Sequence, residues 1–144
     1  MVFLMLNKEE IKNIIPQREP FLMIDEVEDY VPGEKCIAYK NVDAEDVFFK
    51  VHFPANPVMP GVLIVECLAQ TGAVAILSLE ENKGKNVLFA GINKMKFKKV
   101  VVPGERIKLE VKLIKQKGSV GIGEGTAMVD DKVVAKGELT FAIV

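Results

Sequence analysis

The longest apolar run of the chain, GVLIVECLAQTGAVAILSL at residues 61–79, most constrains how it can fold. As a helix this run is about 28 Å long at 1.5 Å per residue. A membrane span needs about 20 apolar residues with few charges, whereas Glu66 and Gln70 interrupt this run one turn apart. A helix that is apolar all round is otherwise buried on all sides in a soluble protein. We therefore predict a buried central helix over about residues 61–81.

The segments around this run have the alternating pattern of strands. Residues 105–117 alternate strictly, with Ile107, Leu109, Val111 and Leu113 facing inward. Further strands are predicted at residues 21–31, 35–42, 86–100, 119–129 and 132–143, with turns at Pro32-Gly33 and Asp130-Asp131. One antiparallel sheet wrapped around the helix, an α+β architecture, accounts for this order. Because one sheet covers only part of a helix, we expect a second copy of the chain to cover the rest.

Two further segments complete the expected fold. Asn7 followed by Glu10 resembles a capping box and predicts a short helix over residues 8–14, which Pro16 and Pro20 end. Residues 43–60 carry three prolines and are predicted to be irregular. A length of 144 residues suits a single domain over residues 1–144.

Composition excludes several classes of protein. A net charge of −1 provides no basic field for nucleic acid. One histidine and two cysteines exclude a zinc finger and any site built from several histidines of one chain. We expect no metal and no cofactor. The N-terminal MVFLML is shorter than a signal-peptide core, so we expect a mature, cytoplasmic protein in which Cys36 and Cys67 need no oxidation.

The only histidine, His52, is the first candidate for chemistry. It lies in the proline-rich segment FFKVHFPANPVMPG, which leads directly into the central helix. Functional residues concentrate in such loops, although a lone histidine is more often structural. An imidazole titrates near neutral pH, so a neutral histidine is a competent base.

Glu66 is the second candidate, because a carboxylate is costly to bury in an apolar helix. Burial raises the pKa of a carboxyl group and favours the protonated acid. Gln70, four residues on, faces the same way and either orients the carboxyl group or satisfies it. The alternative is a glutamate that faces a wet seam. Cys67 points elsewhere and is interpreted as a core cysteine.

The helix N-terminus at Pro60-Gly61 is the third candidate. With Pro60 at the first helical position, free N–H groups suit a carbonyl oxygen that gains negative charge, and Gly61 has no side chain to block it. Base, acid and carbonyl-polarising donor are the parts needed to remove water from a β-hydroxy carbonyl compound. The same spacing equally permits a hydrolase in which Glu66 activates water.

Other segments carry weaker signals. Gly121, Gly123 and Gly125 alternate at period two, which indicates a bent or crowded strand rather than a dinucleotide-binding loop. Four lysines form a basic strip that is either a solvated strand face or a docking site for an acidic partner. These lysines are Lys94, Lys96, Lys98 and Lys99.

HFPANPVMPGVLIVECLAQTG resembles the signature of the β-hydroxyacyl-acyl carrier protein dehydratases of the FabZ type. IPQREPFLMIDEV, KNVDAEDVFFKVHFP and FAGINKMKFKKVVVPGERIKLEV are similar to other segments of that family, in the same order. The resemblance implies a hotdog fold and a dimer, often assembled into a hexamer as a trimer of dimers. It also implies dehydration of a (3R)-hydroxyacyl thioester on acyl carrier protein to the trans-2-enoyl product, without metal or organic cofactor.

Carried over residue by residue, the family's catalytic histidine falls on His52 and its glutamate on Glu66. The resemblance implies that these two meet across the dimer interface, with the Gly61 N–H holding the thioester carbonyl. A related branch that also isomerises the product usually has aspartate at position 66, which favours the simple dehydratase.

The chain departs from the family at three positions. Gln17 replaces a usual histidine, and Val51 and Ala55 replace usual glycines on either side of His52. These changes concern loop geometry. Two rival functions stay open: an acyl thioesterase with Glu66 as general base, and a non-catalytic acyl-binding subunit.

Overall fold

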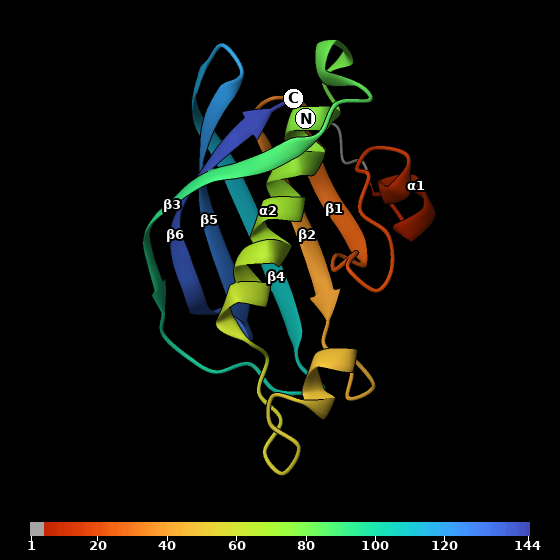
Figure 1. The fold of residues 1–144 in the computed structure, drawn as a ribbon, viewed down its shortest axis with the longest axis vertical. Coiled ribbons are helices and arrows are strands. Elements are labelled where there is room, and N and C mark those ends of the chain that lie inside the picture. Colours follow the sequence, from red (N-terminus) through yellow and green to blue (C-terminus); the bar gives the residue numbers. More distant parts are fainter. Residues whose placement is uncertain (1–4) are drawn as a thin grey trace.

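The fold is a six-stranded antiparallel sheet curved around one long helix, which confirms the predicted α+β architecture (Figure 1). The computed structural model describes residues 5–144. The sheet order is β1-β2-β4-β5-β6-β3. The strands are β1 (Glu26–Val31), β2 (Lys35–Asn41), β3 (Val87–Phe97), β4 (Arg106–Lys117), β5 (Val120–Val129) and β6 (Lys132–Ile143). The helices are α1 (Lys8–Lys12), α2 (Gly61–Leu77) and two 3-10 turns, η1 (Val47–Lys50) and η2 (Glu80–Asn82).

The central helix α2 ends earlier than the predicted residue 81. Beyond Leu77, polar groups satisfy the last carbonyls: the Ser78 hydroxyl donates to Ala75 O at 3.0 Å, and Asn82 Nδ2 donates to Ile76 O at 3.0 Å. The chain then turns into η2. At the other end Pro60 is the N-cap residue and not the first helical position. Hydrogen bonds set both ends of the helix, and the hydropathy pattern of the sequence does not show them.

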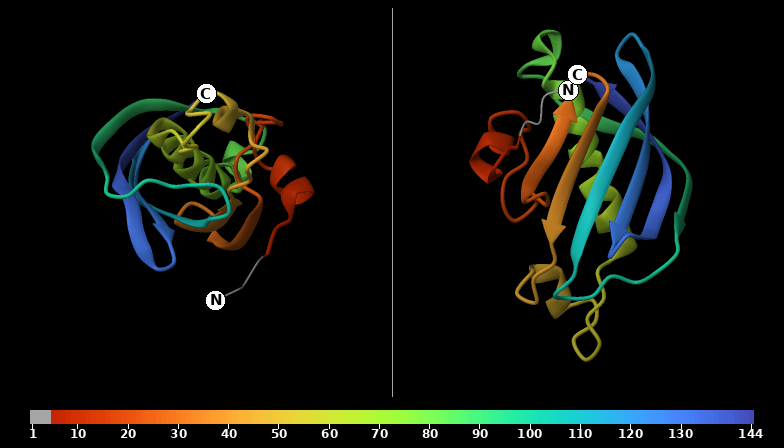
Figure 2. Two further views of the ribbon diagram at one scale, coloured as in Figure 1. Left: turned by 90° about the horizontal axis from the view of Figure 1, so that it is seen from below. Right: turned by 180° about the vertical axis from the view of Figure 1, so that it is seen from behind.

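The C-terminal half of α2 is buried on all sides, as predicted, with every residue from Gln70 to Leu77 covered. Figure 2 shows the helix lying within the curve of the sheet. The N-terminal half is not. Val62 is 73% exposed, and Glu66 and Ala69 are half-buried, so these three residues form an uncovered stripe. Among the described residues no helix is both long and apolar enough to cross a membrane.

The second half of the chain follows the predicted strands closely. In β4, Ile107, Leu109 and Val111 are fully buried and Leu113 is partly so. The β5–β6 hairpin turns at Asp130-Asp131, both with φ near +50° to +63° as a tight two-residue turn requires. Strict alternation specifies such strands because a one-residue shift reverses every side chain.

The first half shows larger differences. The strand predicted over residues 21–31 begins only at Glu26, because the backbone of residues 21–23 bonds to the helix instead of a strand. The capping box of α1 is confirmed, but the helix stops at Lys12, before either proline. Residues 43–60 contain the 3-10 turn η1 ahead of the prolines. Of the N-terminal MVFLML segment, residues 1–4 lie outside the described part of the chain.

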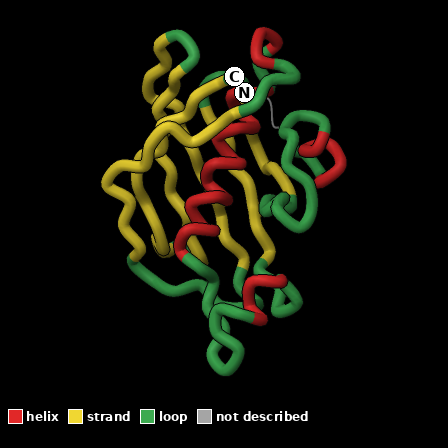
Figure 3. The backbone as a smooth tube through the Cα atoms, in the orientation of Figure 1, coloured by secondary structure: helices red, strands yellow, loops and turns green. Residues whose placement is uncertain are grey.

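The two edge strands of the sheet, β1 and β3, differ in what covers them (Figure 3). Edge strand β1 is bridged by Leu6, whose N–H and C=O both bond to Val27. Within residues 5–144, edge strand β3 pairs only with β6. It exposes a row of large apolar side chains, Leu88, Phe89, Ile92 and Phe97, each between 41% and 53% exposed. An open apolar edge is a template for pairing with another chain.

Glycines mark close approaches between elements. A Cβ at Gly123 meets Val111 at 3.0 Å, and one at Gly125 meets Leu68 at 3.3 Å, which confirms the predicted crowding at these two glycines; Gly121 is looser, with its nearest atom at 3.8 Å. The tightest approach to backbone is at Gly137 in β6, where a Cβ lies 2.6 Å from Met95 Cα in β3.

We expect Gly137→Ala to displace the edge strand β3. Because the contact is with backbone, the variant should lose about 1–3 kcal/mol of unfolding free energy. Gly91→Ala is the matched control, since its Cβ meets nothing closer than 3.7 Å and should change stability by less than about 0.5 kcal/mol. Urea unfolding of both proteins checks this, and equal stabilities contradict it.

Candidate functional site

His52 lies in the loop between η1 and α2. Figure 1 shows this loop below the N-terminus of α2. Its Nδ1 is 2.8 Å from Val58 O, and its ring stacks on Phe53 at 4.2 Å between centroids. A carbonyl oxygen only accepts, so Nδ1 carries the proton and donates this bond. In the neutral ring this tautomer leaves Nε2 without a proton, which is the form that a base requires.

The two unusual residues of this loop fit its backbone. Val51 caps η1 with φ −123° and ψ −9°, a conformation outside the left-handed region that favours glycine. Ala55 is exposed at the tip of the loop. Neither replacement of glycine therefore strains the loop around His52.

Glu66 lies in the uncovered stripe of α2, with its carboxyl group half-buried. Burial raises the pKa of this carboxyl above its ordinary value of 4.5, and a hydrogen bond from Gln70 partly opposes the rise. Gln70 Nε2 donates to Glu66 Oε2 at 2.9 Å, as their spacing of one helical turn predicts. The result is an acid that keeps its proton to higher pH than an exposed glutamate.

Gln70 is itself fully buried and uses its whole amide. Its Oε1 accepts from Met23 N–H at 2.8 Å, and its Nε2 also donates to Phe21 O at 2.8 Å. Gln70 therefore both orients the Glu66 carboxyl and anchors residues 21–23 against the helix. From the sequence, Gln70 either orients the Glu66 carboxyl group or satisfies its hydrogen bonding, and the structure shows one bond that does both.

Gly61 is the first residue of α2. The N–H groups of Gly61 and Val62 have no hydrogen-bond acceptor among the described residues, while those of Leu63 and Ile64 bond to Pro60 O. A Cβ at Gly61 meets the Phe97 ring at 2.9 Å, so only glycine fits without displacing that ring. Free N–H groups at a helix start, with the positive end of its dipole, favour an oxygen that gains negative charge.

Two of the three candidates, Gly61 and Glu66, lie on the same helix. Glu66 lies five residues after Gly61 on the same helix, about 7.5 Å along its axis, and helical side chains lean back toward the N-terminus. The hydrogen bonds of His52 and Glu66 lead to different partners, Val58 and Gln70. Among the described residues no hydrogen bond therefore links His52 to Glu66.

A small pocket of about 40 Å³ adjoins Glu66 and includes a residue that the sequence did not place there. We call it the Glu66 pocket. It is lined by Gln17, Glu66, Ala69, Ala73, Val87, Leu88, Phe89 and Phe141. Gln17 was singled out only as a departure from a family pattern, because its distance of 49 positions from Glu66 gives no local signal of contact.

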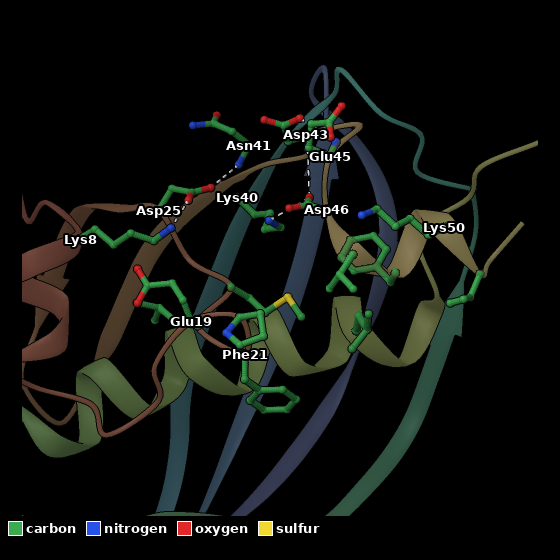
Figure 4. Close-up of a pocket in the computed structure, with 17 residues that line it drawn as sticks. Lys8, Glu19, Phe21, Asp25, Lys40, Asn41, Asp43, Glu45, Asp46 and Lys50 are labelled. Atoms are coloured by element: carbon green, nitrogen blue, oxygen red, sulfur yellow. Dashed lines mark hydrogen bonds and ion pairs between the residues drawn. The ribbon is translucent and has the colours of Figure 1, made fainter. Parts of the chain in front are cut away.

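A wide groove of about 910 Å³ lies between the segment after α1 and the η1 turn (Figure 4). Four of its eight charged residues are paired with one another: Lys8 with Asp25 at 3.1 Å, and Lys40 with Asp46 at 3.2 Å. Figure 4 shows these pairs along one side of the groove, and its lining includes neither His52 nor Glu66. Its lining does include Val51, which precedes His52, and Leu63 in the first turn of α2, so the groove borders the candidate site.

Three of the four predicted docking lysines share a pocket of about 240 Å³ at the end of β3. Lys99 is not in its lining, and Lys136 of β6 joins it as the cross-strand partner of Lys96. We call Lys94, Lys96, Lys98 and Lys136 the lysine cluster. Two acidic residues, Glu124 and Glu138, also line this pocket, and Glu124 lies 3.7 Å from Lys136. Lys136 belongs to the cluster because β6 pairs with β3, and the sequence of β3 alone does not show this pairing.

Neither cysteine has the properties of a nucleophile. Cys36 and Cys67 are free and buried, and burial raises the pKa of both thiols, that of Cys67 to about 12. Cys67 is thus the core residue that the sequence predicts. Among the described residues no cluster of three or more His, Cys, Asp or Glu side chains is placed to hold a metal ion.

The FabA-like domain family matches residues 15–138 of the chain. The dehydratase heterocomplex ApeI:P from Xenorhabdus doucetiae has a similar fold, with a TM-score of 0.74 at 18% identity over 92% of this chain and 89% of its own. The chain therefore belongs to the FabA-like family, and its sheet wrapped around one helix is the hotdog fold.

Relatives of higher sequence identity show which type within the FabA-like family the chain represents. A protein of Clostridium kluyveri named 3-hydroxyacyl-(acyl-carrier-protein) dehydratase FabZ is 61% identical over 135 residues, 94% of each chain. The protein of that name from Clostridium tetani is 58% identical over 94% of this chain and 95% of its own. Within the FabA-like family the chain is thus of the FabZ dehydratase type, an enzyme of the hydro-lyase class.

We expect Glu66→Gln to stabilise the fold at neutral pH. Below pH 4.5 the wild-type carboxyl is protonated in both states; as pH rises through the raised folded pKa, its ionisation costs stability that the amide variant does not lose. The gain should therefore be smallest near pH 4 and largest above neutrality, about 0.5–2 kcal/mol as for other single stabilising changes.

Urea unfolding at both pH values and one protein concentration measures this gain. The same substitution at the exposed Glu81 is the control. A Glu66→Gln protein that is less stable than wild type at pH 8 contradicts burial as the cause of the raised pKa.

Proposed function

We propose that this enzyme dehydrates a (3R)-3-hydroxyacyl thioester, carried on acyl carrier protein, to the trans-2-enoyl thioester in fatty acid synthesis. Glu66 is the acid, His52 is the base and no metal takes part. The observation that carries the proposal is the half-buried Glu66 carboxyl, held by Gln70 one and a half turns from the free N–H groups of α2. We also expect a cytoplasmic enzyme, since both cysteines are free thiols.

Each group has a step in this reaction. Nε2 of His52 takes the proton from the carbon beside the thioester carbonyl. The Gly61 N–H holds the carbonyl oxygen as negative charge develops on it. The C3–O bond then breaks with its electron pair on oxygen, and the Glu66 carboxyl gives that oxygen its proton, so that water leaves. Glu66 must therefore be protonated at the start, which its raised pKa favours.

We propose that His52 reaches Glu66 of a second copy, so that the site is complete only in a homodimer. Two features support this arrangement. The uncovered stripe of α2 leaves Val62 73% exposed beside Glu66. The neighbouring edge strand β3 offers unpaired backbone and four exposed apolar side chains. Pairing of two β3 edges covers both features at once, which is the economical way to bury them.

His52→Ala and Glu66→Gln should each lower kcat by about 10²-fold or more, the usual scale for acid–base groups. The wild-type rate should be bell-shaped in pH, with apparent pKa values that belong to the His52–Glu66 pair, and Glu66→Gln should leave a single limb because one member of the pair is removed. Turnover of crotonyl-acyl carrier protein, read by mass spectrometry in both directions, measures these rates.

Co-expression of the two inactive variants tests the shared site. A mixed dimer contains one wild-type pair and should regain activity, whereas a site built within one chain gives none. Release of free carrier thiol would indicate a thioesterase, and binding without turnover would indicate an acyl-binding subunit. Retained activity in both variants would refute the pair itself.

The lysine cluster is the proposed docking surface for the carrier protein. Its four lysines outnumber its two glutamates, and it lies beside Phe97, whose ring contacts Gly61. Successive strand residues point to opposite faces, so Lys96 points away from the face that Phe97 covers. A flexible thioester arm attached there has only to pass the end of β3 beside Phe97 to reach the helix N-terminus.

Lys96→Glu with Lys98→Glu should raise KM for carrier-bound substrate about tenfold and weaken its salt dependence, with kcat unchanged. The paired control is Lys83→Glu with Lys85→Glu, which makes the same charge change at exposed positions outside the cluster. Steady-state kinetics with carrier-bound and N-acetylcysteamine substrates measure this. An equal loss with the short substrate contradicts docking.

A further inference from the structure

We propose that the Glu66 pocket is the seat of the water molecule that the reaction removes or adds, and that Gln17 is the residue that positions this water. The proposal rests on the proposed dehydratase function and assigns a role to a residue outside the acid–base pair.

The pocket has the size and polarity of a water site. Its volume of about 40 Å³ exceeds the roughly 10–15 Å³ that one water needs and is far below the roughly 300 Å³ of an ordinary ligand pocket. Gln17 and Glu66 are its two polar side chains, and the other six lining residues are apolar. A buried water typically needs two to four polar partners.

Gln17 offers an unused hydrogen-bond acceptor in this pocket. Its Oε1 is buried and has no partner among the described residues, which is rare for a buried polar atom. Its backbone is fixed by Arg18, whose guanidinium donates to Gln17 O at 2.8 Å, to Ile15 O at 2.9 Å and to Lys12 O at 3.0 Å. The backbone is therefore fixed beside the pocket that Gln17 lines, and its side-chain oxygen lacks a donor that a water supplies.

The helix keeps this space open. Ala69 and Ala73 follow Glu66 by three and seven residues, so they share its side of α2 and leave room above the carboxyl group. Leu88 and Phe89 of β3 close the opposite side and are themselves partly exposed. A departing water thus has an immediate place beside the acid that protonated it.

The reaction gives this place a function. When the C3–O bond breaks and Glu66 protonates the oxygen, the new water moves into the pocket and donates to Gln17 Oε1. In the reverse direction the same water gives one proton to the Glu66 carboxylate while its oxygen bonds to C3 of the enoyl thioester. The electron pair of the C2–C3 double bond takes the proton that His52 Nε2 returns to the carbon beside the carbonyl. Held in the pocket, the water returns to C3 more often than it escapes.

Two isotopes measure this return. A (3R)-3-hydroxybutyryl-carrier substrate with oxygen-18 in its hydroxyl is incubated with enzyme in heavy water of ordinary oxygen. At low conversion, mass spectrometry of the remaining hydroxy substrate gives the deuterium gained beside the carbonyl and the oxygen-18 lost from C3. A water that returns gives deuterium gain without oxygen loss, and so does reprotonation of the carbon before the C3–O bond breaks. The wild-type ratio of oxygen loss to deuterium gain should therefore be well below one, and the change of this ratio in the pocket variants reports on the water.

Gln17→Met removes the acceptor at similar volume and should raise this ratio about fivefold, the factor that one ordinary hydrogen bond supports. Gln17→His keeps an acceptor nitrogen and should stay near wild type. Ala69→Val fills the pocket from the helix and should give the same rise if Gln17→Met does not fold. Gln116→Met is the matched control, since Gln116 is exposed and outside the pocket.

The outcomes separate this proposal from the proposed function. A wild-type ratio of one overturns the water seat while leaving the dehydratase intact, and so does an unchanged ratio in folded Gln17→Met or in Ala69→Val. A purely structural role of Gln17 lowers the rate of both exchanges and leaves their ratio unchanged. Absence of both exchanges and of enoyl product in wild type overturns the dehydratase itself.

Discussion

The structure depends on covering a helix that is apolar on every side. The concave sheet encloses the C-terminal half of α2 from Gln70 to Leu77 completely. It leaves the N-terminal half with an uncovered stripe, in which Val62 is 73% exposed. The candidate chemistry lies at this boundary, because Glu66 is buried enough for its pKa to rise and open enough to meet a substrate.

A single amide joins the fold to the site. Gln70 bonds to Glu66, to Phe21 O and to Met23 N–H, so one buried side chain orients the acid and holds the segment that precedes β1. Such a network is costly to leave partly satisfied, which makes its members rigid together. The acid is thus positioned by residues more than 40 positions away in the chain, and not by its helix alone.

The sequence predicted best where one local pattern decides the structure. Strict alternation in residues 105–117 specified β4, and Asp130-Asp131 correctly marked the turn between β5 and β6. Boundaries failed where a distant group intervenes: Gln70 takes the backbone of residues 21–23 away from a strand, and Asn82 reaches back to Ile76 O to end α2. At the candidate site, His52, Glu66, Gly61 and Gln70 were identifiable because each residue type is costly or special in its local setting.

By itself the sequence determined the fold class, the buried helix and the residue types available for chemistry, because these follow from periodicity and from the cost of placing polar groups among apolar ones. Tertiary structure decided which groups meet. Gln17 reaches the pocket of Glu66, and Lys136 joins the lysines of β3, through contacts between segments that no local pattern connects. The physical reason is that hydropathy reports whether a side chain is buried, whereas its neighbours depend on how the sheet closes around the helix.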